Sequence, residues 1–324
     1  MDLGLFCNRQ GVAGQSPSDV FDGLVAQTRT ARRAGFDLVA AGQHFLPDYP
    51  QLQTLPTLSR LAAEAGSMDL ATGVLLLPFH HPVAVAEDLA TLDAIADGDV
   101  IAGVGAGYRD VEFDAFGIRK QERVPRLVEG LTLLRRLLTE EFVTFDGDYY
   151  AVEDATTSPR PESSPPIWLA ANATPAVERA ARLADAWLVN PHATMGEIAT
   201  QKTRYDEIRR ERGEDTAVPL FREAFVAETT DEAVETAREY LEPKYERYLA
   251  WGQDEAMEDE ADLHRSFEDL RRDRFLLGSP VEVAGQLEVA TERVDASHAI
   301  LRMNWPGMPA EQTCRSIELL ADAI

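Results

Sequence analysis

Short runs of apolar residues alternate with longer amphipathic segments along most of the chain. Runs that are apolar at nearly every position predict strands buried on both faces, and apolar residues spaced three and four apart predict helices. The apolar runs predict eight strands, at Leu3–Cys7, Leu38–His44, Leu70–Leu77, Val100–Gly107, Ile167–Asn172, Trp187–Asn190, Leu220–Ala227 and His298–Trp305. The amphipathic segments predict helices at Ser18–Ala34, Leu55–Gly66, Val83–Ile95, Arg123–Leu138, Pro175–Leu183, Glu197–Arg212, Asp231–Leu249 and Ala310–Ile324.

This alternation of strands and helices predicts a parallel α/β fold. Eight such units in 324 residues favour a closed (β/α)8 TIM barrel, formed by residues 1–324 as one domain with insertions at the C-terminal mouth of the barrel. A doubly wound dinucleotide-binding sheet fits less well. The glycine-rich segment Gly103–Gly107 lacks the Gly-x-Gly-x-x-Gly spacing of such sheets, and it follows the fourth strand instead of the first.

Two excursions interrupt the alternation. The first, at about 142–166, contains Asp146-Gly147, a pair of residues typical of the turn of a β-hairpin. The second, at about 248–276, is strongly acidic and has few apolar positions. An insertion that follows a barrel strand lies near the catalytic mouth, so this segment either covers the site or forms a solvated loop.

The composition is strongly acidic, with 56 Asp and Glu against 31 Lys and Arg and a formal net charge of −25. This charge disfavours nucleic acids and anionic membranes as partners. An acidic surface with few lysines predicts a halophilic source, because salt screens its self-repulsion. No apolar run is long enough to span a membrane, and the N-terminus has no basic export signal, so we expect a soluble cytoplasmic protein.

The strand ends that would form the barrel mouth carry mainly small, aromatic and amide residues, among them Phe6, His44 and Tyr108. No strand end carries a lysine or a cluster of acids, which argues against Schiff-base chemistry and against a metal-dependent hydrolase. The adjacent His80 and His81 make a poor metal site, because neighbouring side chains on an extended chain point apart. We therefore expect no metal ion.

The segment Asn172-Ala173-Thr174-Pro175 follows the fifth predicted strand. Thr174 is a good helix N-cap, and Pro175 suits the first position of a helix. Small residues at a helix start allow backbone N–H groups to approach an anion. The segment is therefore either a phosphate site or an ordinary capped helix.

Several degenerate motifs occur in order over nearly the whole chain. They are Thr72–Asp93 around the third strand, Gly103–Arg109 followed by Glu112–Gly117, Phe145–Tyr150, Pro166–Asn172, Ala184–Trp187 and Gly278–Val283. Each motif alone is weak, but the ordered set resembles the bacterial luciferase-like monooxygenase family.

This resemblance implies a flavin-type oxidoreductase or monooxygenase that acts on a small organic substrate, with either reduced FMN and O₂ or hydride transfer by the deazaflavin coenzyme F-420. It also implies a cis peptide at Gly73–Val74, in a bulge of the third strand that supports the cofactor ring. His44 matches the second of two paired histidines of luciferase, and we expect it to transfer a proton. The cofactor-binding residues that the resemblance implies are Phe6, Gly73, Val74, Ala106, Gly107, Tyr108, Asn172, Ala173 and Thr174.

Some positions depart from the family. The catalytic histidine of luciferase falls on Gln43, which argues against light emission. Tyr108 stands where deazaflavin-dependent sugar-phosphate dehydrogenases carry a catalytic Glu, which disfavours that activity. A non-catalytic flavin-binding or accessory relative is the alternative to an enzyme.

The resemblance also implies partners. A flavin reductase would supply reduced FMN, and the chain would form a homodimer or a larger assembly. We expect apolar helix faces to form the contact between subunits, including Val83, Val85, Leu89 and Leu92.

Overall fold

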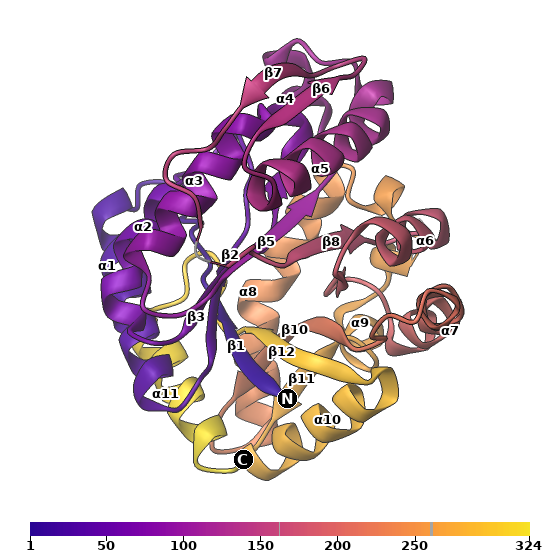
Figure 1. Ribbon diagram of the computed structural model, residues 1–324. Helices are drawn as coiled ribbons and strands as arrows, with labels where there is room; N and C mark the ends of the chain where they lie inside the picture. The colour runs from indigo at the N-terminus through magenta and orange to yellow at the C-terminus, as the bar shows by residue number, and fades with distance from the viewer. Residues whose placement is uncertain (162, 260–261) are drawn as a thin grey trace.

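The computed structural model describes residues 1–161, 163–259 and 262–324, and parallel strands within these ranges close into a barrel (Figure 1). Around the ring the order is β1, β2, β3, β5, β8, β9, β10 and β12, and β12 pairs with β1 to complete it. The bounds are β1 Asp2–Phe6, β2 Leu38–Ala41, β3 Asp69–Thr72, β5 Val100–Gly105, β8 Ile167–Ala171, β9 Ala186–Val189, β10 Val218–Val226 and β12 Ala296–Arg302. The predicted (β/α)8 TIM barrel is confirmed.

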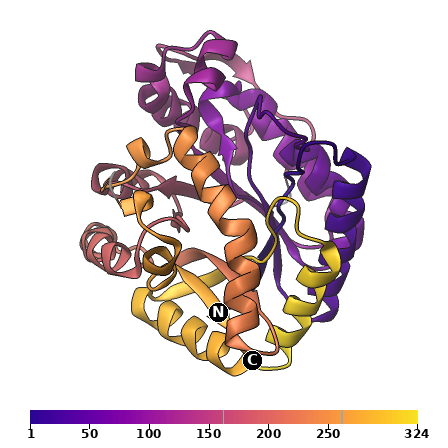
Figure 2. The ribbon, with the colours of Figure 1, turned by 180° about the vertical axis from the view of Figure 1, so that it is seen from behind.

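Helices cover the outside of the barrel, as Figures 1 and 2 show from opposite sides. They are α1 Pro17–Arg33, α2 Thr54–Ala65, α3 Pro82–Ile95, α4 Asp110–Phe116, α5 Arg123–Thr139, α6 Thr174–Leu183, α7 Met195–Glu211, α8 Thr230–Ala250, α9 Phe267–Arg271, α10 Pro280–Val294 and α11 Ala310–Ala321. Capping boxes with Thr194 and Ser279 as N-caps begin α7 and α10. In the described part of the chain, no helix combines the length and the apolar character that a membrane crossing requires.

Successive residues of each strand point to two different cores. Leu38 and Ala40 on β2 face the small core inside the barrel, whereas Val39 and Ala41 face the large core between the strands and the helices. This arrangement explains why the strands are apolar at nearly every position. Because the strands are parallel, their carboxyl ends all open at one end of the barrel.

The third strand is bulged. A second short strand, β4 (Leu75–Leu76), continues β3 after Gly73–Val74. Between its pairings with β5 at Ala71 and at Leu75, the third strand takes four residue steps where β5 takes three, so it contains one extra residue. The Gly73–Val74 peptide is cis. The bulge and the cis peptide were both predicted, and both are confirmed.

The first excursion contains an antiparallel hairpin of β6 (Val143–Asp146) and β7 (Ala151–Ala155). The Gly147 N–H donates a 3.0 Å hydrogen bond to the Tyr150 carbonyl oxygen within the turn. Figure 1 shows this hairpin at the outer edge of the molecule, beside α4 and α5.

The acidic segment 248–276 is more regular than its composition indicates. It contains the end of α8, all of α9 and the first half of a strand, β11 (Phe275–Gly278), which pairs with the second half of β10. The sequence analysis did not predict β11, α10 or α4. Apolar residues at wide spacing, such as Leu263, Phe267 and Leu270, are buried here, and the many acids around them hide the pattern.

The expected interface residues on α3 are largely used within the chain. Val85, Leu89 and Leu92 are buried against the barrel, so the expectation that they form a contact between subunits is wrong, whereas Val83 is half-buried. Helix α10 instead exposes two large apolar side chains, Val281 and Val289.

Candidate functional site

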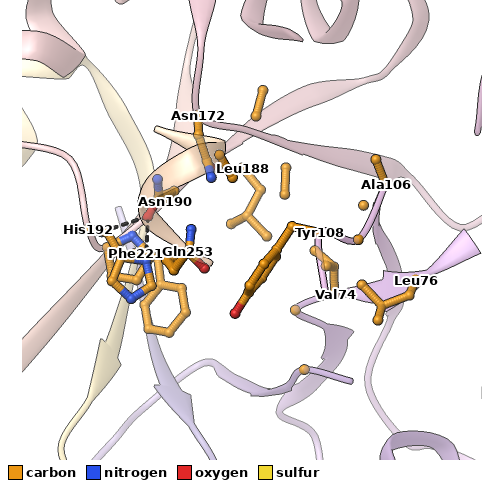
Figure 3. Close-up of a pocket in the computed structure, with 18 of the residues that line it drawn as sticks. Val74, Leu76, Ala106, Tyr108, Asn172, Leu188, Asn190, His192, Phe221 and Gln253 are labelled. Carbon is orange, nitrogen blue, oxygen red and sulfur yellow. Dashed lines mark hydrogen bonds between the residues drawn. The ribbon is translucent and has the colours of Figure 1, made fainter. Parts of the chain in front are cut away.

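A cavity of about 410 Å³ opens at the carboxyl ends of the barrel strands (Figure 3). In this view Val74, Leu76 and Ala106 lie on one side, and His192 and Phe221 lie on the other. The ring of Tyr108 projects between the two groups. The cavity therefore has apolar walls with a few polar groups, as is typical of a site for a small organic molecule.

The cavity brings together nearly all the predicted site residues. His44 and every predicted cofactor-binding residue except Thr174 line it, and they come from the ends of separate strands. These cofactor-binding positions are Phe6, Gly73, Val74, Ala106, Gly107, Tyr108, Asn172 and Ala173.

On the side of the bulged strand, backbones approach one another closely. A Cβ atom at Gly42 would lie 2.7 Å from the Gly73 carbonyl oxygen, and one at Gly105 would lie 2.9 Å from Cγ2 of Val74. Only glycine permits these contacts. They present the bulge, with Val74 on it, as one wall of the cavity.

Gln43 holds the bulged strand in place. Its Oε1 accepts a 3.0 Å hydrogen bond from the Leu76 N–H and lies 2.8 Å from Nε2 of His80. Burial lowers the pKa of His80. Gln43, which aligns with the catalytic histidine of luciferase, thus positions the bulged strand here.

Helix α6 begins at the cavity without a side-chain cap. Ala173, and not Thr174, is its N-cap, so the prediction that Thr174 caps the helix is wrong. The Thr174 N–H instead donates a 2.7 Å hydrogen bond to Oε2 of Glu258, which belongs to the acidic segment. A carboxylate therefore occupies the start of this helix, where the helix dipole favours an anion.

Two arginines, Arg123 and Arg179, line the same cavity. Burial lowers the pKa of Arg179. Together with the α6 N-terminus, they are the positive groups on this part of the cavity lining.

His44 is oriented by a buried carboxylate. Its Nδ1 lies 3.1 Å from Oε1 of Glu112, whose side chain is completely buried. The same oxygen accepts a 2.7 Å hydrogen bond from the Phe45 N–H and lies 3.3 Å from Nη1 of Arg109. With Nδ1–H donating to Glu112, Nε2 of His44 keeps its lone pair for a ligand.

Aromatic rings surround His44 on the cavity side. The centroids of Tyr108, Trp251 and Tyr248 lie 5.7, 5.4 and 6.5 Å from the imidazole. The guanidinium of Arg109 lies 4.0 Å above the Trp251 ring, a cation–π contact. The Tyr108 hydroxyl is buried without a hydrogen-bond partner in the described structure. These groups shield the imidazole from bulk water.

The far side of the barrel holds buried charges. Glu223 lies 3.2 Å from Arg302, contacts Lys244 closely and accepts a 2.6 Å hydrogen bond from the Trp305 indole. Burial alone would raise the pKa of Glu223, but Lys244 and Arg302 together hold it below its usual range. Arg302 lines the cavity and packs 4.4 Å from the Phe6 ring centroid.

No metal site accompanies these groups. Within the described ranges, no three His, Cys, Asp or Glu side chains are grouped as metal ligands. His80 contacts Gln43, and His81 caps helix α3 through the Val83 N–H, so the two adjacent histidines act separately.

Sequence reasoning missed several residues of the site. Arg109 and Glu112 lie three positions apart, at the end of one motif and the start of the next, and this spacing is itself a signal that the two charges are neighbours at a helix start. Tyr248 and Trp251 lie in the acidic segment, where composition indicated solvent. No local pattern marked Arg302, because its partner Glu223 is 79 positions away.

Comparisons with known proteins identify the family and the fold. Residues 1–297 match the family described as luciferase-like monooxygenase. The chain is 37% identical over 175 residues to an F420-dependent glucose-6-phosphate dehydrogenase of Intrasporangium calvum. That match covers 51% of this chain and 52% of the relative, so the chain spans about half the length of the curated relatives it matches.

Solved structures match over the whole barrel. The monooxygenase RslO1 from Streptomyces bottropensis has a TM-score of 0.87 and 25% identity, with 100% of this chain and 98% of that chain covered. The oxygenating constituent of 3,6-diketocamphane monooxygenase from Pseudomonas putida, solved with FMN, has a TM-score of 0.81 and 20% identity over 100% and 98% of the two chains, and shows the same fold. The chain belongs to the luciferase-like monooxygenase family.

Proposed function

We propose that this chain is an oxidoreductase that binds FMN or the deazaflavin coenzyme F-420 in the barrel-mouth cavity and acts on a small organic substrate. The observation that carries the proposal is the oriented imidazole of His44, which faces an apolar cavity with an anion-binding helix start at its rim. Relatives described as F420-dependent dehydrogenases and a structural neighbour solved with FMN support this choice of cofactors.

The residues present fit such a cofactor. Both candidates carry a flat ring system and a phosphate. The glycine-lined wall with Val74 leaves room for the ring, and the α6 N-terminus with Arg123 and Arg179 suits the phosphate. The Glu258 carboxylate at the helix start supports this fit, because it accepts a hydrogen bond from the Thr174 N–H as a phosphate oxygen would.

When bound, FMN in its reduced form supplies O₂ activation, and F-420 supplies hydride transfer. The chain supplies proton transfer and orientation. Nε2 of His44 accepts a proton from a substrate hydroxyl or returns one to it, while Glu112 fixes the ring through Nδ1. Tyr108 and Trp251 limit the access of water to this transfer.

Titration with each cofactor in molar KCl, followed by absorbance of the ring, tests the proposal. We expect saturable binding of one cofactor and substrate-dependent consumption of its reduced or oxidised form. Failure of both cofactors to bind would refute the proposal. Tight binding without turnover would favour the alternative, a non-catalytic relative.

We also propose that the chain works as a homodimer or larger assembly in a salt-rich cytoplasm, with a flavin reductase as partner if the cofactor is FMN. The net charge of −25 makes subunits repel, and molar salt shortens the range of this repulsion from about 10 Å to about 3 Å. Val281 and Val289 on α10 offer apolar surface for contact. Sedimentation across a KCl series should show association that strengthens with salt, and a monomer at every salt concentration would contradict it.

A further inference from the structure

Arg9 is a buried cation that the proposed cofactor site does not use. It follows β1, lines the cavity and is 5% exposed. Its Nη1 donates to the Leu52 carbonyl oxygen. Its Nε is buried without any hydrogen-bond partner among the described residues.

Arg9 differs from the nearby buried cations Arg302 and Arg109, which have carboxylate partners. Arg302 shares Glu223 with Lys244, and Arg109 lies against Glu112. Within the described ranges, no carboxylate lies within ion-pair distance of Arg9, although acids outnumber bases in the chain 56 to 31. Burial lowers the pKa of Arg9 to about 10, so the guanidinium still carries its charge at neutral pH. A buried charge without a partner is costly, and a ligand anion would compensate it.

The position of Arg9 separates it from the phosphate end of the cavity. In the eight-strand ring, β8 lies four places from β1, so the start of α6 lies across the barrel from Arg9. Arg9 instead shares its side with His44. Tyr248 lies near both, because its ring lies 6.5 Å from His44 and it interacts electrostatically with Arg9.

The chemistry of the Arg9 side chain selects its ligand. Nη1 is engaged, but the edge formed by Nε and Nη2 has no recorded hydrogen bond within the described chain. A carboxylate matches this edge with two parallel hydrogen bonds. One unpaired guanidinium balances one negative charge, which favours a carboxylate over a doubly charged phosphate. The nearby cavity walls include Phe6 and Phe221, which suit an apolar body.

We propose that the substrate is a small apolar carboxylic acid, whose carboxylate binds the Nε and Nη2 edge of Arg9 while its reacting carbon faces Nε2 of His44. This proposal rests on the proposed oxidoreductase function, since it names the substrate class of that cavity. It assigns Arg9 to substrate recognition and leaves the cofactor phosphate to the opposite side.

Matched pairs of probes test the proposal. Binding of 3-phenylpropanoate and 3-phenylpropanamide, and of cyclohexanecarboxylate and its amide, would be measured by calorimetry on the protein loaded with whichever cofactor it binds. We expect the acids to bind about ten- to hundredfold more tightly than the amides. Equal affinity within both pairs would overturn the proposal, and this comparison requires no variant.

Variants locate the effect. Arg9→Gln should erase the preference for the acids. Arg9→Lys should keep part of it, because the positive charge remains while the pair of parallel N–H donors of the guanidinium is lost. Arg315→Gln, which removes an exposed arginine paired with Glu228, should leave the preference intact. A preference that persists in Arg9→Gln would overturn the proposal.

Two controls separate Arg9 from the cofactor. Inorganic phosphate should not compete with the acids on the loaded protein, and competition would move the acid site to α6. Arg9→Gln should leave cofactor affinity and the cofactor's reduction potential unchanged, and a shifted potential with an intact acid preference would assign Arg9 to the ring instead. If neither cofactor binds, the same calorimetry on the chain alone still tests the acid preference, so failure of the proposed function is distinguishable.

Discussion

The half of the barrel from β1 to β5 differs from the half from β8 to β12 in what fills the space between the strands. In the first half, backbones meet at glycines such as Gly42, Gly103 and Gly105, where an added Cβ atom would collide with a neighbour. In the second half, Glu223 of β10 is buried and pairs with the buried cations Lys244 and Arg302. One half is shaped by the absence of side chains, and the other by charges that compensate one another.

The two halves therefore depend on their sequence in two different ways. A missing side chain acts through packing at short range, so a single methyl group is enough to disturb it. A buried charge acts through its partners, so its effect depends on residues far away in the sequence. The cavity needs both, because the first half supplies the wall beside the proposed ring and the second half supplies cations at the opposite wall.

The largest expected effect comes from the glycine half. In Gly103→Ala the new Cβ would lie 1.8 Å from the Thr72 carbonyl oxygen, a backbone atom that cannot move without disturbing the third strand. We expect a loss of stability beyond the usual overpacking cost of about 1–3 kcal/mol, or failure to fold. Chemical unfolding measures it.

Gly285→Ala is the matched control for this substitution. Gly285 lies within α10 with no atom near its added Cβ, so the change should stabilise the helix by about 1 kcal/mol. If both variants had the same stability as the wild-type chain, the close packing at Gly103 would not contribute to the stability of this half of the barrel.

The next prediction concerns the charged half. Glu223→Gln keeps the shape of the side chain but leaves Lys244 and Arg302 without their shared counter-ion. Breaking a buried ion pair costs about 3–5 kcal/mol, so we expect a loss of that size in the free energy of unfolding. The control, Glu228→Gln, breaks an exposed pair with Arg315 and should cost at most about 1 kcal/mol. Similar losses in the two variants would refute the role of charge compensation.

More of the first half than of the second half could be predicted from the sequence. The eight strands were predictable, because apolar runs are local patterns. The partners of Glu223 were not, since Lys244 and Arg302 lie 21 and 79 positions away. The role of Glu112 beside His44 was missed for the same reason, because 68 positions separate the two. Trp251 and Glu258 were also missed. They lie in the acidic segment, and their contacts are with residues far away in the sequence.

The third prediction tests the proton-transfer group between the halves. His44→Ala should lower turnover about hundredfold or more, with little change in cofactor affinity, because Nε2 supplies the proton transfer. Glu112→Gln should lower turnover less and alter its pH profile, since the amide still contacts Nδ1 but carries no charge. Unchanged turnover in His44→Ala would exclude a catalytic role for this imidazole.

The fourth prediction uses pH to probe the charged half. Burial, and then the nearby cations Lys244 and Arg302, lower the pKa of His192 well below 6.5. The unfolded chain takes up a proton at this residue below about pH 6.5 and the folded chain does not, so folding stability should fall as the pH drops below that value.

One such group contributes at most about 1.4 kcal/mol per pH unit. His192→Gln should therefore flatten the dependence of stability on pH between about 6.5 and 5, relative to the wild-type chain. Urea unfolding at several pH values measures the slope. An identical slope in both proteins would mean that His192 is not held neutral by its surroundings.

The smallest expected effect concerns the contact of the Glu258 carboxylate with the start of α6, which a bound phosphate would replace. Glu258 accepts a hydrogen bond from the Thr174 N–H at the start of α6, so it competes with any phosphate that binds there. An anion at a helix N-terminus gains about 0.3–1 kcal/mol, and removing the internal competitor should strengthen phosphate and cofactor binding about two- to fivefold. Glu258→Ala makes that change.

Glu255→Ala separates this contact from the general effect of removing a negative charge. Glu255 lines the cavity, and its carboxylate lies 3.4 Å from Lys120 without a hydrogen bond to α6 within the described chain. We expect a smaller gain in affinity for inorganic phosphate in this variant than in Glu258→Ala, measured by calorimetry at one KCl concentration. Equal gains would mean that only the net charge near the cavity matters. No gain in either variant would mean that phosphate does not bind at the start of α6. The buried charges of the second half would then only balance one another and would not bind this ligand.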